Sequence, residues 1–153
     1  MSGKDALVEL LRLQREQEAA QAPADWNTVL VDWTRNLRQV LDTMRAWLDA
    51  DAFKKFLRVE SFTVSLSEDH LGSYEVPALR ILAPAGRTVE INPRARLVSG
   101  AQGRIDMRSG PNRAILVLGQ DGLWRFPATY VSGRSEVVLS EDSFSEALRE
   151  LLA

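Results

Sequence analysis

The hydrophobic positions of residues 25–49 follow a helical period and predict the longest helix of the chain. Seven apolar side chains recur at alternating spacings of four and three residues, and they include three of the four tryptophans: Trp26, Leu30, Trp33, Leu37, Val40, Met44 and Trp47. This spacing places all seven on one side of a helix. Charged residues occupy mainly the other side, so we expect this helix to bury its apolar face against the rest of the fold.

The same apolar stripe has a second interpretation, as a groove or a dimer seam. A surface stripe of this size would be an aggregation hazard. The rings of Trp26, Trp33 and Trp47 are also too bulky for a regular coiled-coil seam, which prefers branched aliphatic side chains. We therefore assign the stripe to internal packing.

The N-terminal segment predicts a shorter first helix. Ser2 can cap it, and its apolar side ends near Gln14. Pro23 then interrupts the chain before Asp25, which can cap the long helix. We expect these two helices to form a helical hairpin over residues 1–58.

From residue 59 the hydrophobic period becomes that of a strand. Phe62, Val64 and Leu66 alternate with serine and threonine, a pattern typical of a strand with one dry and one wet face. Short alternating segments separated by glycine, proline and asparagine follow, so residues 59–140 predict an antiparallel meander of about seven strands. The apolar run 114–118 does not alternate, which indicates a strand covered on both faces.

Residues 141–153 predict a final helix. Ser143 and Glu146 have the spacing of a capping box, and the apolar positions of this helix are Phe144, Leu148, Leu151 and Leu152. The whole pattern predicts one α+β domain, residues 1–153, in which the sheet packs on the long amphipathic helix with the first and last helices alongside.

The amino-acid composition narrows the chemistry. The chain contains no cysteine, which removes disulfide frameworks, thiolate zinc sites and cysteine nucleophiles and fits a reducing compartment. Charged residues run through the first twenty positions, and no stretch has the length of a membrane span. We expect a soluble cytoplasmic protein without membrane association.

The net charge of −2 conceals a basic central block. Lysine and arginine number nine against thirteen aspartates and glutamates in residues 1–79, nine against three in residues 80–134, and one against five in residues 135–153. All nine cations of the central block are arginines, whose rigid fork of donors suits carboxylates, phosphates and aromatic faces. Either acidic helices neutralise a basic sheet within the monomer, or the block meets an acidic partner.

The turns predict which of these arginines lie together. If residues 99–103 close a hairpin, Arg96 faces Asp106 as an ordinary ion pair and Arg94 faces Arg108. If residues 109–112 close the next hairpin, Arg108 also faces Arg113.

These two hairpins would place Arg94, Arg108 and Arg113 side by side on three strands. Like charges directly opposite one another destabilise a sheet. The row therefore requires an anion, a carboxylate from elsewhere in the fold, or a different register. The candidate residues for binding a ligand or partner are Arg94, Arg96, Arg104, Arg108 and Arg113.

Other chemistry has weaker support. His70 is the only histidine, and it follows Ser67, Glu68 and Asp69 in one loop segment, where neighbouring residues rarely point at one another as a catalytic triad must. The same segment lacks the spacing of a metal site, and no glycine cluster fits a dinucleotide fingerprint or a phosphate-binding loop. We expect neither a metal nor a cofactor.

The sequence favours a non-catalytic binding or regulatory protein that engages an acidic protein surface or an anionic ligand through its arginines. Nucleic-acid binding is the alternative, because Trp124, Arg125 and Phe126 place aromatic rings beside a cation. The acidic overall charge and the lack of lysine in the central block count against it. A small hydrolase that uses His70 comes third.

Overall fold

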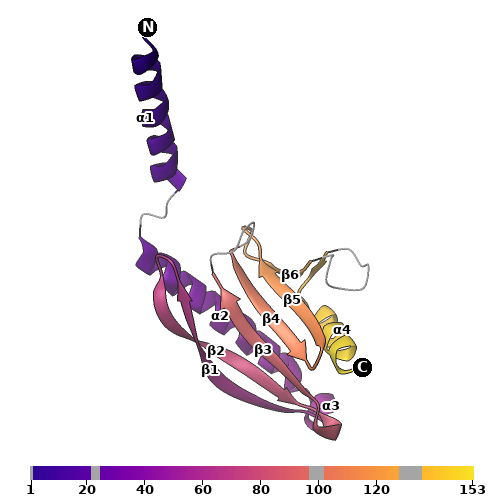
Figure 1. Cartoon of the computed structure of the whole chain (residues 1–153). Coiled ribbons are helices and arrows are strands. Elements are labelled where there is room, and N and C mark those ends of the chain that lie inside the picture. The colour runs from indigo at the N-terminus through magenta and orange to yellow at the C-terminus, as the bar shows by residue number, and fades with distance from the viewer. Residues whose placement is uncertain (1, 22–24, 97–101, 128–135) are drawn as a thin grey trace.

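The structure is a computed structural model that describes residues 2–21, 25–96, 102–127 and 136–153 (Figure 1). Its elements are α1 (Gly3–Gln21), α2 (Trp26–Leu48), α3 (Asp51–Lys54), β1 (Arg58–Glu68), β2 (Gly72–Leu82), a 3-10 turn η1 (Pro84–Gly86), β3 (Thr88–Ala95), β4 (Gly103–Ser109), β5 (Asn112–Leu118), β6 (Trp124–Phe126), β7 (Val137–Val138) and α4 (Glu141–Leu152).

The seven strands of the described chain form one antiparallel sheet. Their order in the sheet is their order in the sequence, from β1 at one edge to β7 at the other (Figure 1). Each strand therefore pairs with the next one along the chain, which is the arrangement that short turns between alternating segments favour. The predicted α+β class and the seven-stranded meander are confirmed.

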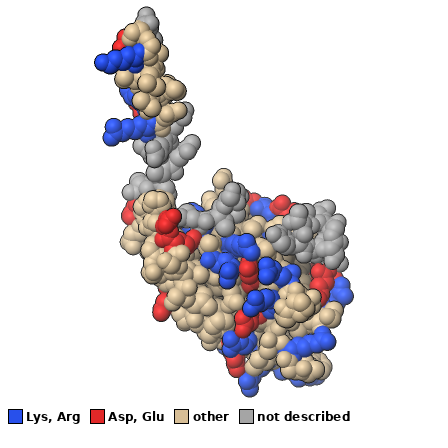
Figure 2. All heavy atoms as spheres, in the orientation of Figure 1, with Lys and Arg blue, Asp and Glu red and all other residues tan. Residues whose placement is uncertain are grey.

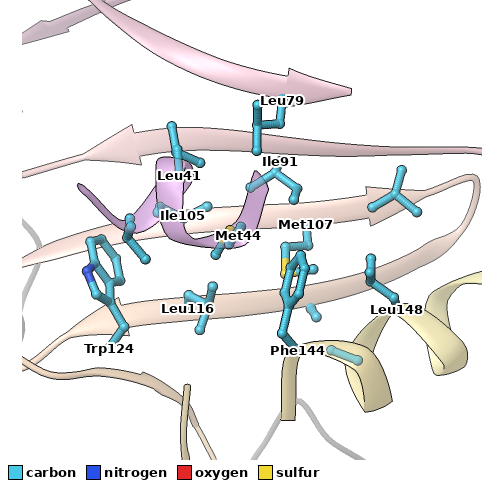
Figure 3. Packing of buried hydrophobic residues seen from close by; sticks show 14 of the residues in the cluster. Leu41, Met44, Leu79, Ile91, Ile105, Met107, Leu116, Trp124, Phe144 and Leu148 are labelled. Atoms are coloured by element: carbon cyan, nitrogen blue, oxygen red, sulfur yellow. The ribbon is translucent and has the colours of Figure 1, made fainter. Parts of the chain in front are cut away.

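Helices α2 and α4 cover one face of this sheet and enclose the core. The buried residues of α2 are Trp33, Leu37, Val40, Leu41, Met44 and Leu48. Figure 3 shows Met44 of α2 near Ile105 and Met107, and Phe144 of α4 beside Met107, on the same side of the sheet. The stripe on α2 is core, as predicted, because its spacing matches one face of a helix laid on a sheet.

Both helices begin with a side-chain cap. The backbone N–H of Asn27 donates to the Asp25 carboxylate at 2.9 Å, as predicted for α2. The cap of α4 is one turn earlier than the sequence indicated: Ser140 Oγ accepts from the Ser143 N–H at 3.1 Å, and Ser143 Oγ accepts from the Ser140 N–H at 2.7 Å. Ser140 has extended backbone geometry, which a helix cap requires.

Helix α1 differs from its prediction in position. It extends to Gln21, beyond the apolar side that ends near Gln14, because the polar, alanine-rich second half consists of strong helix formers. Figure 1 shows α1 projecting away from α2 and the sheet, and its large apolar residues Leu7, Val8, Leu10, Leu11 and Leu13 are 45–57% exposed. The predicted packed hairpin is therefore not present. No helix in the described part of the chain combines the length and apolar character needed to cross a membrane.

Candidate anion-binding face of the sheet

The face of the sheet opposite α2 and α4 carries the arginines. On β4, Ile105 and Met107 point into the core, so the alternating Arg104, Asp106 and Arg108 lie on the other side. Figure 2 shows lysine and arginine atoms gathered on this side over the middle strands, with a smaller number of acidic atoms among them. We call this side of the sheet the charged face.

Three adjacent strands form a polar hollow on the charged face. Its volume is about 160 Å³, and its lining residues are Asn92, Arg94, Arg104, Asp106, Arg108 and Arg113. We call it the arginine hollow. It brings together four of the five candidate binding residues that the sequence singled out.

Asp106 organises one side of the hollow. Arg104 reaches both oxygens of this carboxylate, with Nε at 2.7 Å from Oδ1 and an Nη at 3.3 Å from Oδ2. Arg94 Nε lies 3.6 Å from Oδ2, which is too long for a hydrogen bond, and its side chain is 62% exposed. Arg104 is therefore fixed by Asp106, whereas Arg94 is held loosely.

Arg108 and Arg113 form the other side. They are directly opposite each other on β4 and β5, as predicted, and both are exposed. Neither makes an ion pair or a hydrogen bond with another described residue, whereas the nearby Arg80 lies 3.2 Å from Glu90. Two adjacent guanidinium groups that make no ion pair repel each other, and Glu90, which faces Arg108 on β3, is paired with Arg80 instead.

The predicted register of the β3–β4 hairpin is wrong by four residues on β3. Glu90, and not Arg94, faces Arg108, and the predicted ion pair between Arg96 and Asp106 does not form. The last pair of this ladder joins Ala95 to the start of β4, so the connection is longer than the predicted turn at 99–103, most of which lies outside the described residues.

Arg96 does not reach the hollow. Its backbone N–H donates to the Glu68 carboxylate at 2.9 Å, and Glu68 also accepts from the Tyr74 hydroxyl. Trp33 Nε1 donates to the same Tyr74 oxygen at 2.9 Å. Burial raises the pKa of the Tyr74 hydroxyl above its ordinary value, and the hydrogen bond to Glu68 adds to this shift. Arg96 thus adjoins a half-buried network that holds the β1–β2 hairpin against α2.

Two residues of the hollow were missed by the sequence reasoning. Asp106 was assigned to the wrong arginine, although its alternation with Arg104 and Arg108 on one strand could have placed all three on one face. Asn92 was not considered. Its Nδ2 donates to Glu90 at 3.4 Å, while its buried Oδ1 accepts no hydrogen bond from a described residue.

His70 lies in the β1–β2 turn and not at the hollow. Its ring stacks on Trp26 at a centroid distance of 4.4 Å and an interplanar angle of 7°. Its φ of 69° is in the left-handed region, which suits a tight turn. Among the described residues, no three histidines or acids lie close enough together to hold a metal ion.

The aromatic residues beside Arg125 face the core. Trp124 is 8% exposed and Phe126 is 2% exposed, so neither ring offers a platform on which a base could stack. Arg125 itself is engaged, with an Nη at 2.9 Å from Asp121 and Nε at 2.9 Å from Glu136. Its hydrogen bond lowers the pKa of Asp121 to about 2.

No protein-family model, no curated protein and no solved structure matches this chain. Evidence for a function therefore comes from the chemistry of the charged face.

Proposed function

We propose that this is a non-catalytic binding or regulatory protein that engages an acidic protein surface or an anionic ligand through the arginine hollow. The observation that supports the proposal most is the pair Arg108 and Arg113, which are adjacent on neighbouring strands and make no ion pair with a described carboxylate, although Glu90 faces Arg108. An external anion would remove their repulsion and gain charge-assisted hydrogen bonds. The lack of cysteine leads us to place this activity in the cytoplasm.

Carboxylates of the sheet itself pair with other arginines of this face. Arg80 lies between Glu60 and Glu90, and Arg104 is bound by Asp106. The expected compensation by acidic helices does not occur on this face, because α2 and α4 pack against the opposite one. Arg108 and Arg113 thus remain without an ion pair to a described residue at one place on the charged face, as a binding site requires.

Nucleic-acid binding is the second candidate, and the exposed arginines alone support it. The two candidates differ in salt dependence. Where backbone phosphates dominate binding, the logarithm of the association constant falls linearly with the logarithm of salt concentration, with a slope that reports the number of phosphate contacts. A slope near one with single-stranded DNA, together with tight binding of an acidic peptide, would favour the protein or small-anion partner.

The proposal is tested with the double variant Arg108→Gln/Arg113→Gln and a fluorescently labelled polyglutamate peptide. Loss of hydrogen bonds to a charged group costs roughly 1.5–3 kcal/mol, so we expect the peptide to bind about 10- to 150-fold more weakly. Arg38→Gln is the control, because Arg38 is exposed on α2 and does not line the arginine hollow, while its replacement also removes one positive charge. Equal peptide affinity of the double variant and the control would contradict the proposal.

A further inference from the structure

We propose that the arginine hollow binds the dianion of a phosphate monoester in preference to a carboxylate or a phosphodiester. This inference rests on the proposed function and specifies the chemistry of its ligand. It follows from three features of the charged face: its residual charge, the arrangement of its free guanidinium groups, and the size of the hollow.

The charge that remains on this part of the sheet matches a dianion. Strand pairing aligns Glu60 with Arg80, Arg80 with Glu90, Glu90 with Arg108, and Arg108 with Arg113. The hollow itself is lined by four arginines and one carboxylate. Arg104 and Arg94 lie against Asp106, whereas Arg108 and Arg113 make no ion pair with a described residue, which leaves two positive charges for a ligand. A phosphate monoester carries about −1.5 to −2 at pH 7, whereas a carboxylate or a phosphodiester carries −1.

The free guanidinium groups also match a phosphate monoester in number. Arg108 and Arg113 are opposite each other on antiparallel strands, where Cβ atoms are about 4.5–5.5 Å apart. One carboxylate has two oxygens and satisfies a single guanidinium fork. A phosphate monoester presents three terminal oxygens, enough for both forks and for the loosely held Arg94.

The hollow is large enough for one such group and too small for a whole ligand. Its volume of about 160 Å³ is below the roughly 300–1,000 Å³ of clefts that enclose complete small molecules. Its polar wall consists of arginine, asparagine and aspartate side chains, without an apolar surface for a ring. The phosphate group would enter the hollow while the rest of its carrier stays outside, so the carrier can be a small metabolite or a phosphorylated protein segment.

The first experiment is a calorimetric titration of the protein with O-phosphoserine and with inorganic sulfate at pH 7 and pH 5. The second pKa of a phosphoserine is about 6, so the dianionic fraction falls about tenfold between these values. We expect phosphoserine to bind about tenfold more weakly at pH 5. Sulfate remains a dianion of the same shape, so its affinity should be unchanged, which controls for titration of the protein itself.

Three variants test the assignment to the hollow. Arg108→Gln and Arg113→Gln should each weaken phosphoserine binding at least tenfold. The phosphoserine affinity of Arg108→Lys should lie between those of the wild type and Arg108→Gln, because lysine keeps the positive charge but lacks the guanidinium fork. Arg38→Gln should bind like the wild type, because Arg38 lies on α2. A peptide with blocked ends and one phosphoserine distinguishes the carriers, since tighter binding than free phosphoserine indicates a protein partner.

Two results would overturn the inference while leaving the proposed function in place. One is equal affinity for the phosphoserine peptide and the same peptide with aspartate. The other is phosphoserine binding that does not change between pH 7 and pH 5. If neither peptide nor polyglutamate binds, the proposed function fails as well.

Discussion

Replacing Trp33 with alanine tests the packing on which the whole fold depends. Trp33 is 1% exposed in the middle of α2, and its ring centroid lies 6.1 Å from that of Trp124. On another side the ring lies against Gly103, so closely that a Cβ at that position would overlap it. Its Nε1 also donates to the Tyr74 hydroxyl oxygen at 2.9 Å. The substitution therefore removes contacts of α2 with β2, β4 and β6 together.

The expected cost follows from the area that the side chain buries. A tryptophan buries about 150–250 Å² of surface, which at about 25 cal/mol per Å² corresponds to roughly 4–6 kcal/mol. Measured truncations of large aromatic side chains to alanine cost about 3–5 kcal/mol, because the surroundings relax in part. We expect about 4 kcal/mol for Trp33→Ala. Domains of this size are commonly stable by about 5–15 kcal/mol, so the variant would be marginal or unfolded.

Urea unfolding followed by far-ultraviolet circular dichroism measures this loss as a lower midpoint. Trp33→Phe is the matched control. It keeps an aromatic ring but loses the hydrogen bond to Tyr74, so we expect a cost of about 1–2 kcal/mol. An unchanged midpoint for Trp33→Ala, together with loss of a dimer in sedimentation, would mean that the stripe is an interface and that the reasoning is wrong.

Three further predictions concern the charges and the turn. Arg108→Gln should raise the melting temperature slightly, because it relieves repulsion, whereas Arg104→Gln should lower it by stripping the main partner from a carboxylate that is 17% exposed. His70→Ala should leave fold and anion binding unchanged, as checked by circular dichroism and titration with phosphoserine. Because Arg125 depresses the pKa of Asp121 to about 2, the stability that this carboxylate contributes is present above about pH 4 and is lost as the pH falls towards 2. Melts of Asp121→Asn should therefore show a weaker pH dependence than the wild type between pH 4 and pH 2.

The sequence was most informative where a hydrophobic period extends over many residues. The stripe on α2 has seven regularly spaced members, and its central residues Trp33, Leu37 and Met44 are all buried. Its ends are less completely buried: Trp26 stacks on His70 and Trp47 packs beside Phe144, and both remain partly exposed. Period alone identifies the buried side of a helix, but not how far the sheet extends beneath it.

The sequence predicts which residues are helical better than it predicts where a helix packs in the fold. The second half of α1 is helical because its residues are good helix formers, yet no pattern within it states whether the helix packs on α2. The glutamate three residues after Ser143 favours a cap at Ser143, whereas Ser140 offers the same chemistry with another serine. The sequence alone does not distinguish two possible capping residues one turn apart, because the choice depends on where the preceding strand ends.

The arginine hollow shows why a wrong register can still identify a surface. Side chains alternate between the faces of a strand with a period of two, so a shift of four residues leaves every side chain on its predicted face and changes only its neighbours. Arg108 therefore remained beside Arg113 on the charged face, while its neighbour on β3 became Glu90.

Arg96 shows the limit of this argument. The pairing of β3 shifts between Pro93 and Ala95, and beyond an irregularity of this kind the alternation no longer determines the face. Arg94 still lines the hollow, but Arg96 contacts Glu68 instead. Which residues share a face can thus be read from one uninterrupted strand, as for Arg104 and Arg108 on β4. Whether their charges are compensated depends on the register between strands, and that register decides which guanidinium groups are free to bind an anion.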